Sequence, residues 1–175
     1  QPNIVPGTFT VIDIANGASS SAQVLTTIGF FNRFVVSYPP ALQTTLGQNY
    51  KFLLYGQKEA FDNKGQPIMV KRVASDTRLV MVSEIASSSA SILQGWESTM
   101  STSLANIMAI TPAKNTDSFT ATNYNGVSVR FKNFPYPDRS IDYALVQHNN
   151  KTYLVIAGSR EAMFAMIDAF LIPGR

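Results

Sequence analysis

The stretch that most restricts the possible folds lies near the C-terminal end, where residues 141–170 read IDYALVQHNNKTYLVIAGSREAMFAMIDAF. Its Asn149-Asn150 pair is typical of a type I′ turn between two antiparallel strands. With this turn the tip, His148 opposite Lys151, is polar, but both faces of the ribbon are mostly apolar. The facing pairs are Leu145 with Leu154 and Tyr143 with Ile156 on one face, and Ala144 with Val155 and Val146 with Tyr153 on the other. A hairpin of this kind belongs inside a sheet that is covered on both sides.

A helix is predicted directly after this hairpin. Ser159 is a favourable N-cap, and Glu161 lies in the first turn, where the helix dipole favours negative charge. The Pro173-Gly174 pair ends the helix. Its apolar stripe consists of Met163, Phe164, Ile167, Phe170 and Leu171. The stripe indicates that the helix packs on one face of the sheet.

A second hairpin is predicted around the Asn125-Gly126 pair, the strongest short turn signal in the chain. The turn pairs Tyr124 with Val127, Thr122 with Val129 and Thr120 with Phe131. The opposite face then carries Asn123, Ser128, Arg130 and Lys132. Because these side chains are polar or charged, we expect this face of the hairpin to meet solvent.

The rest of the chain predicts shorter elements and one long helix. In order, the shorter elements are an irregular arm at 1–7, a strand at 8–14, a segment at 21–31 suited to either a helix or an extended chain, a short strand at 33–38 before Pro39 and Pro40, a hairpin with arms 50–61 and 66–74 around the turn at 62–65, and a strand at 78–85. The long helix spans 88–109, where apolar residues recur at helical spacing and the serines at 87–89 are available as caps.

These elements predict one α+β domain over residues 1–175. It consists of a twisted antiparallel sheet of about seven to nine strands, covered by two or three helices. The chain length of 175 residues is close to that of one domain, and the 45% of apolar residues suffices for a core. No internal repeat or low-complexity linker divides the chain.

The order of these motifs resembles a known family. A helix, the hairpin NYNGVSVRF, the hairpin YALVQHNNKTYLVIAGS and the closing helix REAMFAMIDAF look like the C-terminal half of the PsbP-like fold, and FVVSYPP is similar to its early strand. The tryptophan that often follows that proline is absent here, because PPALQTT follows. The resemblance implies an α/β/α sandwich and an accessory, chaperone-like or lipoprotein domain that binds partners, with no catalytic motif to carry over.

Composition narrows the classes of function further. Only 14% of the residues are charged, and Ser, Thr, Asn and Gln take surface positions that charges usually occupy, which suits a secreted protein, an envelope protein or a particle subunit. The net charge of +3 is not gathered into a basic run, so nucleic acid is not the favoured partner. No apolar run approaches the roughly 18 residues that cross a bilayer.

We therefore expect an extracytoplasmic location, whether periplasmic, envelope-tethered or secreted. The start at Gln1 fits the removal of a signal peptide or a lipoprotein leader, with a lipid tether upstream of residue 1, and fits an arbitrary domain boundary equally well.

Groups with catalytic or metal-binding chemistry are few. The single histidine, His148, lies at an exposed turn, and with no cysteine in the chain a zinc site of the usual kind is excluded. The carboxylate pairs Asp138 with Asp142 and Glu59 with Asp62 have the residue types of a glycosidase, but turn chemistry accounts for them better. A basic cluster in the first hairpin and its exit is interrupted by acids, which is typical of a solvated face; it comprises Lys58, Lys64, Lys71, Arg72 and Arg78. We predict no catalytic residue, no metal site and no cofactor.

The loop NFPYPDR, residues 133–139, is the candidate partner-binding feature. Two prolines restrict its backbone, while Phe134, Tyr136 and Arg139 have the composition of a protein-binding hot spot. The alternative is a loop whose own aromatic side chains pin it to the core.

Three functions remain open. The preferred one is a non-enzymatic accessory domain that recognises a protein partner. The second is a carrier of a small apolar ligand or lipid between sheet and helices, where the adaptable side chains of Met100, Met108, Met163 and Met166 would surround the guest. The third is a hydrolase without a recognisable motif.

Overall fold

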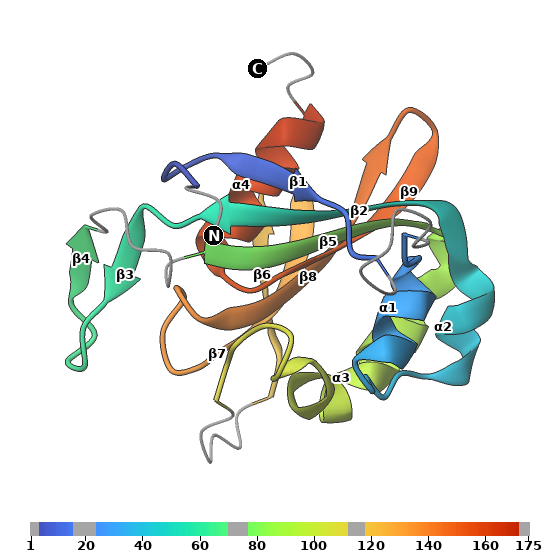
Figure 1. Cartoon of the computed structure of the whole chain (residues 1–175), viewed down its shortest axis with the longest axis horizontal. Helices are drawn as coiled ribbons and strands as arrows, with labels where there is room; N and C mark the ends of the chain where they lie inside the picture. The colour runs from blue at the N-terminus through green and yellow to red at the C-terminus, as the bar shows by residue number, and fades with distance from the viewer. Residues whose placement is uncertain (1–3, 16–23, 70–76, 112–117, 172–175) are drawn as a thin grey trace.

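The computed structural model describes residues 4–15, 24–69, 77–111 and 118–171. Its centre is a seven-stranded antiparallel sheet in the order β1-β2-β5-β9-β8-β7-β6. The strands are β1 (Phe9–Ile12), β2 (Leu46–Gly56), β5 (Thr77–Ile85), β6 (Thr120–Tyr124), β7 (Val127–Asn133), β8 (Ser140–His148) and β9 (Lys151–Ala157). A separate two-stranded ribbon, β3 (Glu59–Phe61) and β4 (Pro67–Met69), projects from one end of the sheet (Figure 1).

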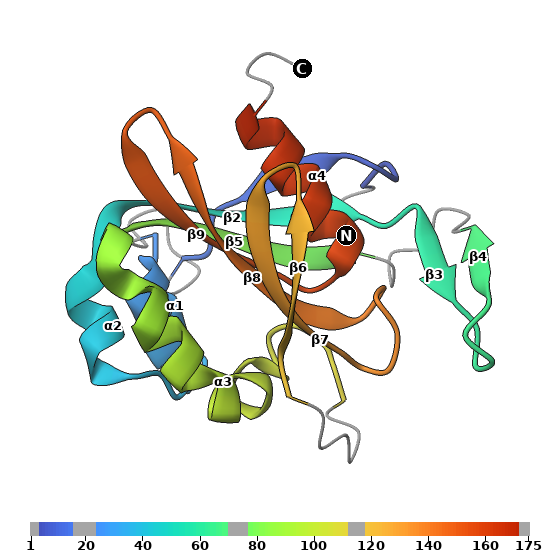
Figure 2. The same cartoon turned by 180° about the vertical axis from the view of Figure 1, so that it is seen from behind.

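Helices cover both faces of the sheet (Figures 1 and 2). The helices are α1 (Thr27–Arg33), α2 (Pro40–Thr45), α3 (Ala90–Leu104) and α4 (Arg160–Leu171). The apolar side chains form two cores: one lies between the sheet and α1 to α3, with Trp96 and Phe31 in its middle, and the other lies under α4, with Met163 and Ile167. The predicted α+β class, with a sheet covered by helices, is confirmed.

The C-terminal hairpin has the predicted register throughout. Leu145 is opposite Leu154, Ala144 opposite Val155, and His148 opposite Lys151. Asn149 and Asn150 have φ values of 49° and 60°, as a type I′ turn requires. β9 pairs with β5 on its other side, so the hairpin lies inside the sheet as its two apolar faces predicted.

The second hairpin also has the predicted register, with Tyr124 opposite Val127 and Thr120 opposite Phe131. The expectation that its polar face meets solvent is wrong for Arg130 and Lys132, which are half-buried. Arg130 donates to both carboxylate oxygens of Glu97 on α3, at 2.7 and 2.6 Å. The helix therefore covers part of this face, a contact that the strand pattern alone does not contain.

The C-terminal helix lies where it was predicted, whereas the helix predicted over 88–109 is shorter, because α3 spans Ala90–Leu104 and the chain turns after it. The two helices also differ in their cap chemistry. The Ser159 hydroxyl accepts the Ala162 N–H at 3.1 Å, as an N-cap does. By contrast, Ser89 donates its hydroxyl to Ala86 O, and residues Ser87–Ser89 form a 3₁₀ turn before α3 instead of capping it. The Pro173-Gly174 stop lies outside the described residues.

The predictions for the N-terminal half need correction. Residues 33–38 are not a strand, because helix α1 ends there: Val35 and Val36 donate their N–H groups to Asn32 O and Phe31 O, the pattern of a Schellman motif. Pro40 then occupies the first turn of α2, a helix that was not predicted. The predicted arm 50–61 is two strands, because β2 continues in the main sheet and only β3 belongs to the small hairpin.

Two predictions fall partly on residues that are not described, and a third needs new bounds. The described part of the segment at 21–31 shows a helix, α1, from Thr27. The arm predicted at 66–74 contains β4 at its start, and 70–74 lie outside the described residues. The predicted strand at 8–14 is shorter, Phe9–Ile12, and pairs along β2 at the sheet edge.

Candidate functional site

A groove of about 550 Å³ separates the β3–β4 hairpin from the loop at 134–139. Its lining residues are Ala60, Phe61, Asp62, Asn63, Ile68, Phe134, Pro135, Tyr136, Asp138 and Arg139. The three candidate residues of the sequence, Phe134, Tyr136 and Arg139, therefore all border one depression. We call it the hairpin groove.

The hairpin wall owes its shape to its turn. The Asp62 carboxylate accepts the N–H groups of Lys64 and Gln66, each at 2.8 Å, and Gly65 has a φ of +77°. The two strands bury little: Ile68 is 50% exposed and Met69 is 74% exposed. Because a two-stranded ribbon presents successive side chains on opposite faces, this arm carries exposed apolar groups on both sides.

The loop wall is closed by its own backbone and pinned by its aromatic rings. Phe134 N–H donates to Arg139 O at 2.7 Å, Arg139 N–H donates to Tyr136 O at 3.1 Å, and the Phe134–Pro135 bond is cis. Phe134 is only 5% exposed and belongs to the core under α3. The alternative of a loop pinned by its own aromatics therefore describes Phe134.

Tyr136 connects the two walls. Its ring stacks on Phe61 of β3 with centroids 5.7 Å apart, and its hydroxyl lies 3.5 Å from Asn63 O. A Cβ atom on Gly65 would lie 2.9 Å from the Tyr136 ring, so glycine is the residue that fits there. The ring thus holds the hairpin tip against the loop and fixes the width of the groove.

A buried polar network holds the base of both walls. Arg78 Nε donates to Asp138 O at 2.7 Å, and Gln57 Nε2 contacts the same oxygen at 3.5 Å. The Ser159 hydroxyl donates to Gln57 Oε1 at 2.7 Å, which links the loop to the N-cap of α4. These four residues are buried, so their hydrogen bonds replace water and keep the loop in one position.

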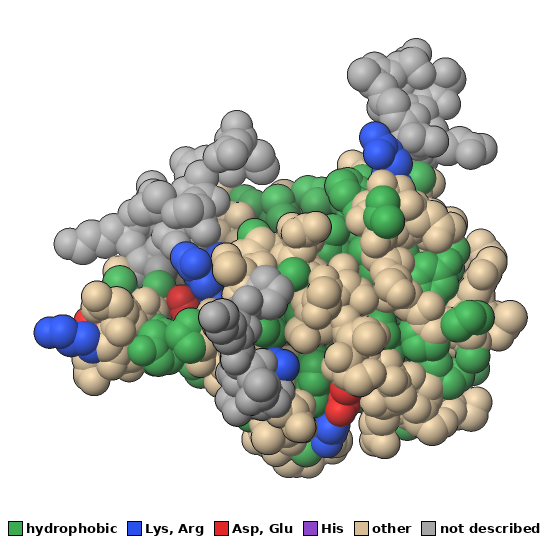
Figure 3. Space-filling model, turned by 90° about the horizontal axis from the view of Figure 1, so that it is seen from below, with side chains coloured by type: hydrophobic (Ala, Val, Ile, Leu, Met, Phe, Trp, Pro, Cys, Tyr) green, Lys and Arg blue, Asp and Glu red, His purple; other side chains and the backbone are tan. Residues whose placement is uncertain are grey.

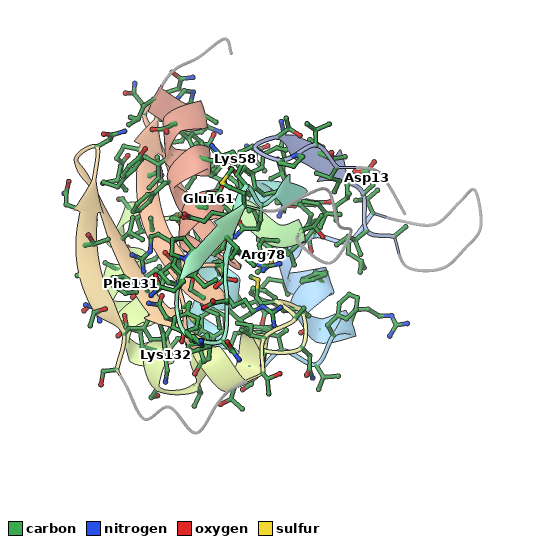
Figure 4. All side chains as sticks on the ribbon, turned by 90° about the vertical axis from the view of Figure 1, so that its left-hand side faces the viewer. Asp13, Lys58, Arg78, Phe131, Lys132 and Glu161 are labelled. Carbon is green, nitrogen blue, oxygen red and sulfur yellow. The ribbon has the colours of Figure 1, made fainter. Side chains whose placement is uncertain are left out.

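Glu161 ties the root of the hairpin to α4. Its carboxylate accepts the N–H groups of Lys58 and Glu59 and the hydroxyl of Tyr55, the last at 2.8 Å. Burial and the neighbouring carboxylate both raise the pKa of Tyr55, so this hydroxyl stays a donor. Figure 4 looks onto this end of the molecule and shows Lys58, Glu161 and Arg78 gathered around the hairpin root. A second groove of about 320 Å³ lies beside them and shares Phe61 and Asp138 with the first.

Arg139 is the exposed charge of the hairpin groove. Its guanidinium makes no ion pair with any residue that the structure describes. Asp138, in contrast, is buried and accepts the Phe61 N–H at 3.4 Å. An unpaired arginine at the rim of a partly apolar groove is suited to bind a carboxylate.

Asp142 and His148, the other candidates for catalytic chemistry, make contacts within the fold. Asp142 is buried and accepts from Arg160 Nε at 2.5 Å, and the Arg160 guanidinium lies 3.5 Å from the centre of the Phe131 ring. The His148 ring meets Phe170 edge-on at 5.5 Å. Among the described residues no group of histidine, aspartate and glutamate is arranged to hold a metal ion.

Glu97, Arg130 and Tyr143 form an ion-pair cluster between α3 and the sheet. Burial alone would raise the pKa of Glu97, but hydrogen bonds from Arg130 and from the Tyr143 hydroxyl, at 2.6 Å, lower it overall. The cluster is only partly exposed and joins three elements, so its charges stabilise the packing of α3.

The four methionines of the carrier hypothesis, Met100, Met108, Met163 and Met166, are buried in the two cores. None of them lines the two grooves above, or a third groove of about 360 Å³ between β2 and the end of α4. Among the described residues these four methionines therefore lie in packed cores and border none of these three grooves, and the carrier hypothesis stays a prediction.

Comparisons of the chain with known protein families, curated proteins and solved structures found no match. The resemblance to the PsbP-like family therefore rests on the residue pattern and stays a prediction. In the described part of the chain, none of the helices has both the length and the apolar character needed to span a membrane.

The sequence predicts the loop as a candidate site, but not most of the residues that position it. Gln57 was not predicted as a site residue, and the prediction that Arg78 belongs to a solvated face is wrong, because Arg78 is buried. The partners of these two side chains are 60 to 102 residues away along the chain. The one available signal was the placement of Gln57 and Arg78 at the ends of apolar strand segments, where a polar side chain needs a partner once it is buried.

Proposed function

We propose that this chain is a non-enzymatic, extracytoplasmic binding domain that recognises an extended, acidic segment of a partner protein in the hairpin groove. The observation that carries the proposal is the groove itself: two walls, a ring that sets their spacing, and an unpaired Arg139 at the rim. Preorganised walls reduce the entropy lost on binding, so a small contact area can suffice.

The chemistry of the groove indicates the kind of segment. Ile68 and Phe61 offer apolar contacts, and Arg139 offers a bidentate partner for a carboxylate. A peptide that places an apolar side chain against Ile68 and an aspartate, glutamate or terminal carboxylate against Arg139 would use both. Neither the carrier nor the hydrolase hypothesis accounts for the exposed apolar side chains of Ile68 and Met69 beside Arg139, which has no ion-pair partner among the described residues.

The test is selection from a displayed random peptide library with the purified domain, followed by affinity measurement on the enriched peptides by fluorescence anisotropy. We expect enrichment of peptides that combine acidic and apolar residues. Arg139→Glu should weaken their binding at least about tenfold, which is a cost of about 1.4 kcal/mol. Ile68→Asp should have a similar effect.

Arg33→Glu is the matched control, because Arg33 is also an exposed arginine but lies on α1, at the far end of the sheet (Figure 1). It should leave the affinity unchanged. The proposal would be overturned by a library selection without enrichment, or by peptides whose binding tolerates both Arg139→Glu and Ile68→Asp.

A further inference from the structure

The layer formed by α1, α2 and α3 carries almost no charge. Between Ile14 and Tyr50 the sequence has one charged residue, Arg33, and between Ala86 and Ala113 it has one, Glu97. Glu97 is already paired with Arg130, so Arg33 is the one charged side chain that the described part of this layer presents unpaired. The whole chain has 14 basic and 11 acidic residues, and apart from Arg33 and Glu97 they all lie outside these two stretches of sequence.

The surface of this layer is polar but neutral. Figure 3 shows the molecule from the side on which α3 lies, and its right-hand part is green and tan over wide areas, with one blue side chain at its upper edge; the other blue and red side chains lie to the left and in the lower centre. Depletion of charge is the compositional mark of the central part of protein interfaces, while ordinary solvent-facing surfaces are rich in lysine and glutamate.

An apolar tip stands on this layer where α1 ends. Phe34 is 47% exposed and Val35 is 89% exposed. Val35 has a φ of +54° at the position of the Schellman motif that glycine usually takes. A β-branched residue is costly in this conformation, and a side chain so exposed gains little from the rest of the chain.

We infer that the α1–α3 layer is a self-association surface, on which Phe34 and Val35 of one copy pack against the same layer of a second copy. Charge favours a second copy as the occupant. The layer holds one residue of each sign, so the net charge of +3 lies outside it. Two copies that meet through these layers therefore bring few charges together, namely Arg33 and the ion-paired Glu97 of each copy, whereas other pairings involve the parts of the chain that hold the remaining 13 basic and 10 acidic residues.

A membrane surface fits the same layer less well. Binding to anionic lipid uses clusters of lysine and arginine beside the apolar groups, and here Arg33 is alone. The self-association surface is also separate from the hairpin groove, since α1 and α2 lie at the opposite end of the sheet from β3 and β4 (Figure 1). A dimer of this kind would leave the hairpin groove of each copy open.

The experiment is sedimentation velocity of the purified domain over a range of concentrations. We expect a concentration-dependent dimer whose dissociation constant rises at least about tenfold with Val35→Asp. Ser37→Lys is a second variant, because it adds a charge beside the tip at an exposed position and leaves the Schellman motif in place. Met69→Asp is the matched control, because Met69 is also a largely exposed apolar residue but lies on the distant hairpin, and it should not change the dimer.

Circular dichroism and thermal unfolding of each variant show whether the fold is kept. A wild-type chain that stays monomeric at all concentrations would overturn the inference, as would a dimer that Val35→Asp and Ser37→Lys leave intact. Co-sedimentation with vesicles of phosphatidylcholine and phosphatidylglycerol tests the other occupant: binding by a monomer that depends on Val35 would assign the layer to lipid and also overturn it.

Discussion

The two ends of the sheet are held together by different chemistry. Under α1 to α3 the contacts are apolar, with Trp96 against Phe31 and Phe30 against Phe52. At the hairpin end, buried polar groups such as Gln57 and Arg78 join the loop, the strands and the start of α4. Apolar packing tolerates changes in side-chain shape and needs no charged groups at the surface above it. A hydrogen-bonded network, in contrast, fixes both the position and the orientation of its donor and acceptor groups. The end with directional hydrogen bonds is therefore the one suited to hold a groove of fixed shape.

The largest effect is expected in the apolar end. Trp96→Ala removes the largest buried side chain of that core and the Nε1 hydrogen bond to Ser37 O. We expect a loss of about 3 to 5 kcal/mol in the free energy of unfolding, measured with urea. Trp96→Phe should cost clearly less, because most of the apolar volume remains. Equal losses for the two variants would contradict the apolar account of this end.

The pH dependence of stability tests the polar end. Burial raises the pKa of Asp142 to about 6, and its Oδ1 has no hydrogen-bond partner among the described residues. The folded protein then binds this proton more tightly than the unfolded chain, whose aspartate has a pKa of about 3.9. The contribution of Asp142 to the free energy of unfolding should therefore be most favourable below about pH 4. It should fall by at most about 3 kcal/mol as the pH rises to 6 and above.

Asp142→Asn should abolish this fall, measured by urea unfolding at several pH values. Glu97 has the opposite effect on stability, because its pKa is lowered in the folded protein. The stability that Glu97 contributes is lost as the pH falls through this lowered pKa. A variant that keeps the wild-type slope between pH 4 and 6 would show that another group is responsible.

The polar network itself can be broken at Gln57. Gln57→Leu leaves the Ser159 hydroxyl without its acceptor inside the protein, so we expect a loss of about 1 to 3 kcal/mol. Hydrogen exchange should also speed up in the loop at 134–139, which the network positions. Gln43→Leu on the exposed side of α2 is the control and should change stability by less than about 0.5 kcal/mol. Similar losses at both sites would remove the contrast between the two ends.

The smallest effect concerns the tip of the neutral layer. Val35→Gly should raise the free energy of unfolding by about 1 kcal/mol, because glycine adopts a positive φ without steric cost. The same variant removes the exposed side chain, so self-association should weaken. A gain in stability together with an unchanged dimer would separate the strain at Val35 from the proposed interface.

Local chemistry explains which parts of the fold could be predicted. The Asn149-Asn150 and Asn125-Gly126 turns set the register of two hairpins, because a two-residue turn with positive φ leaves one way to pair the strands. Ser159 likewise marks its helix start with its own side chain. Each of these signals lies within a few residues of the structure it specifies.

The failures have a common physical cause, which is that distant contacts decide the outcome. Residues 33–38 have strand propensity, but Phe31 and Val36 are buried in the helical core, and that burial favours a helix end with a strained Val35. Arg130 was placed in solvent because nothing near it in sequence reveals Glu97. In the candidate site the loop residues Phe134, Tyr136 and Arg139 were predicted, but their supports at Gln57 and Arg78 were not.

The strand order has a consequence for how the chain reaches its native state. β6 to β9 pair with their neighbours along the chain, whereas β5 joins β9 across a long segment of sequence. Loop closure costs less entropy for the local pairs, so we expect the ribbon of β8 and β9 to form early and the seam with β5 late. Val146→Ala on β8 should then slow folding more, relative to its effect on stability, than Val82→Ala on β5, where Val82 is opposite Val155 of β9. The reverse ranking in stopped-flow refolding would contradict this order. The pairing of β5 with β9 at the centre of the sheet would therefore be the last to form.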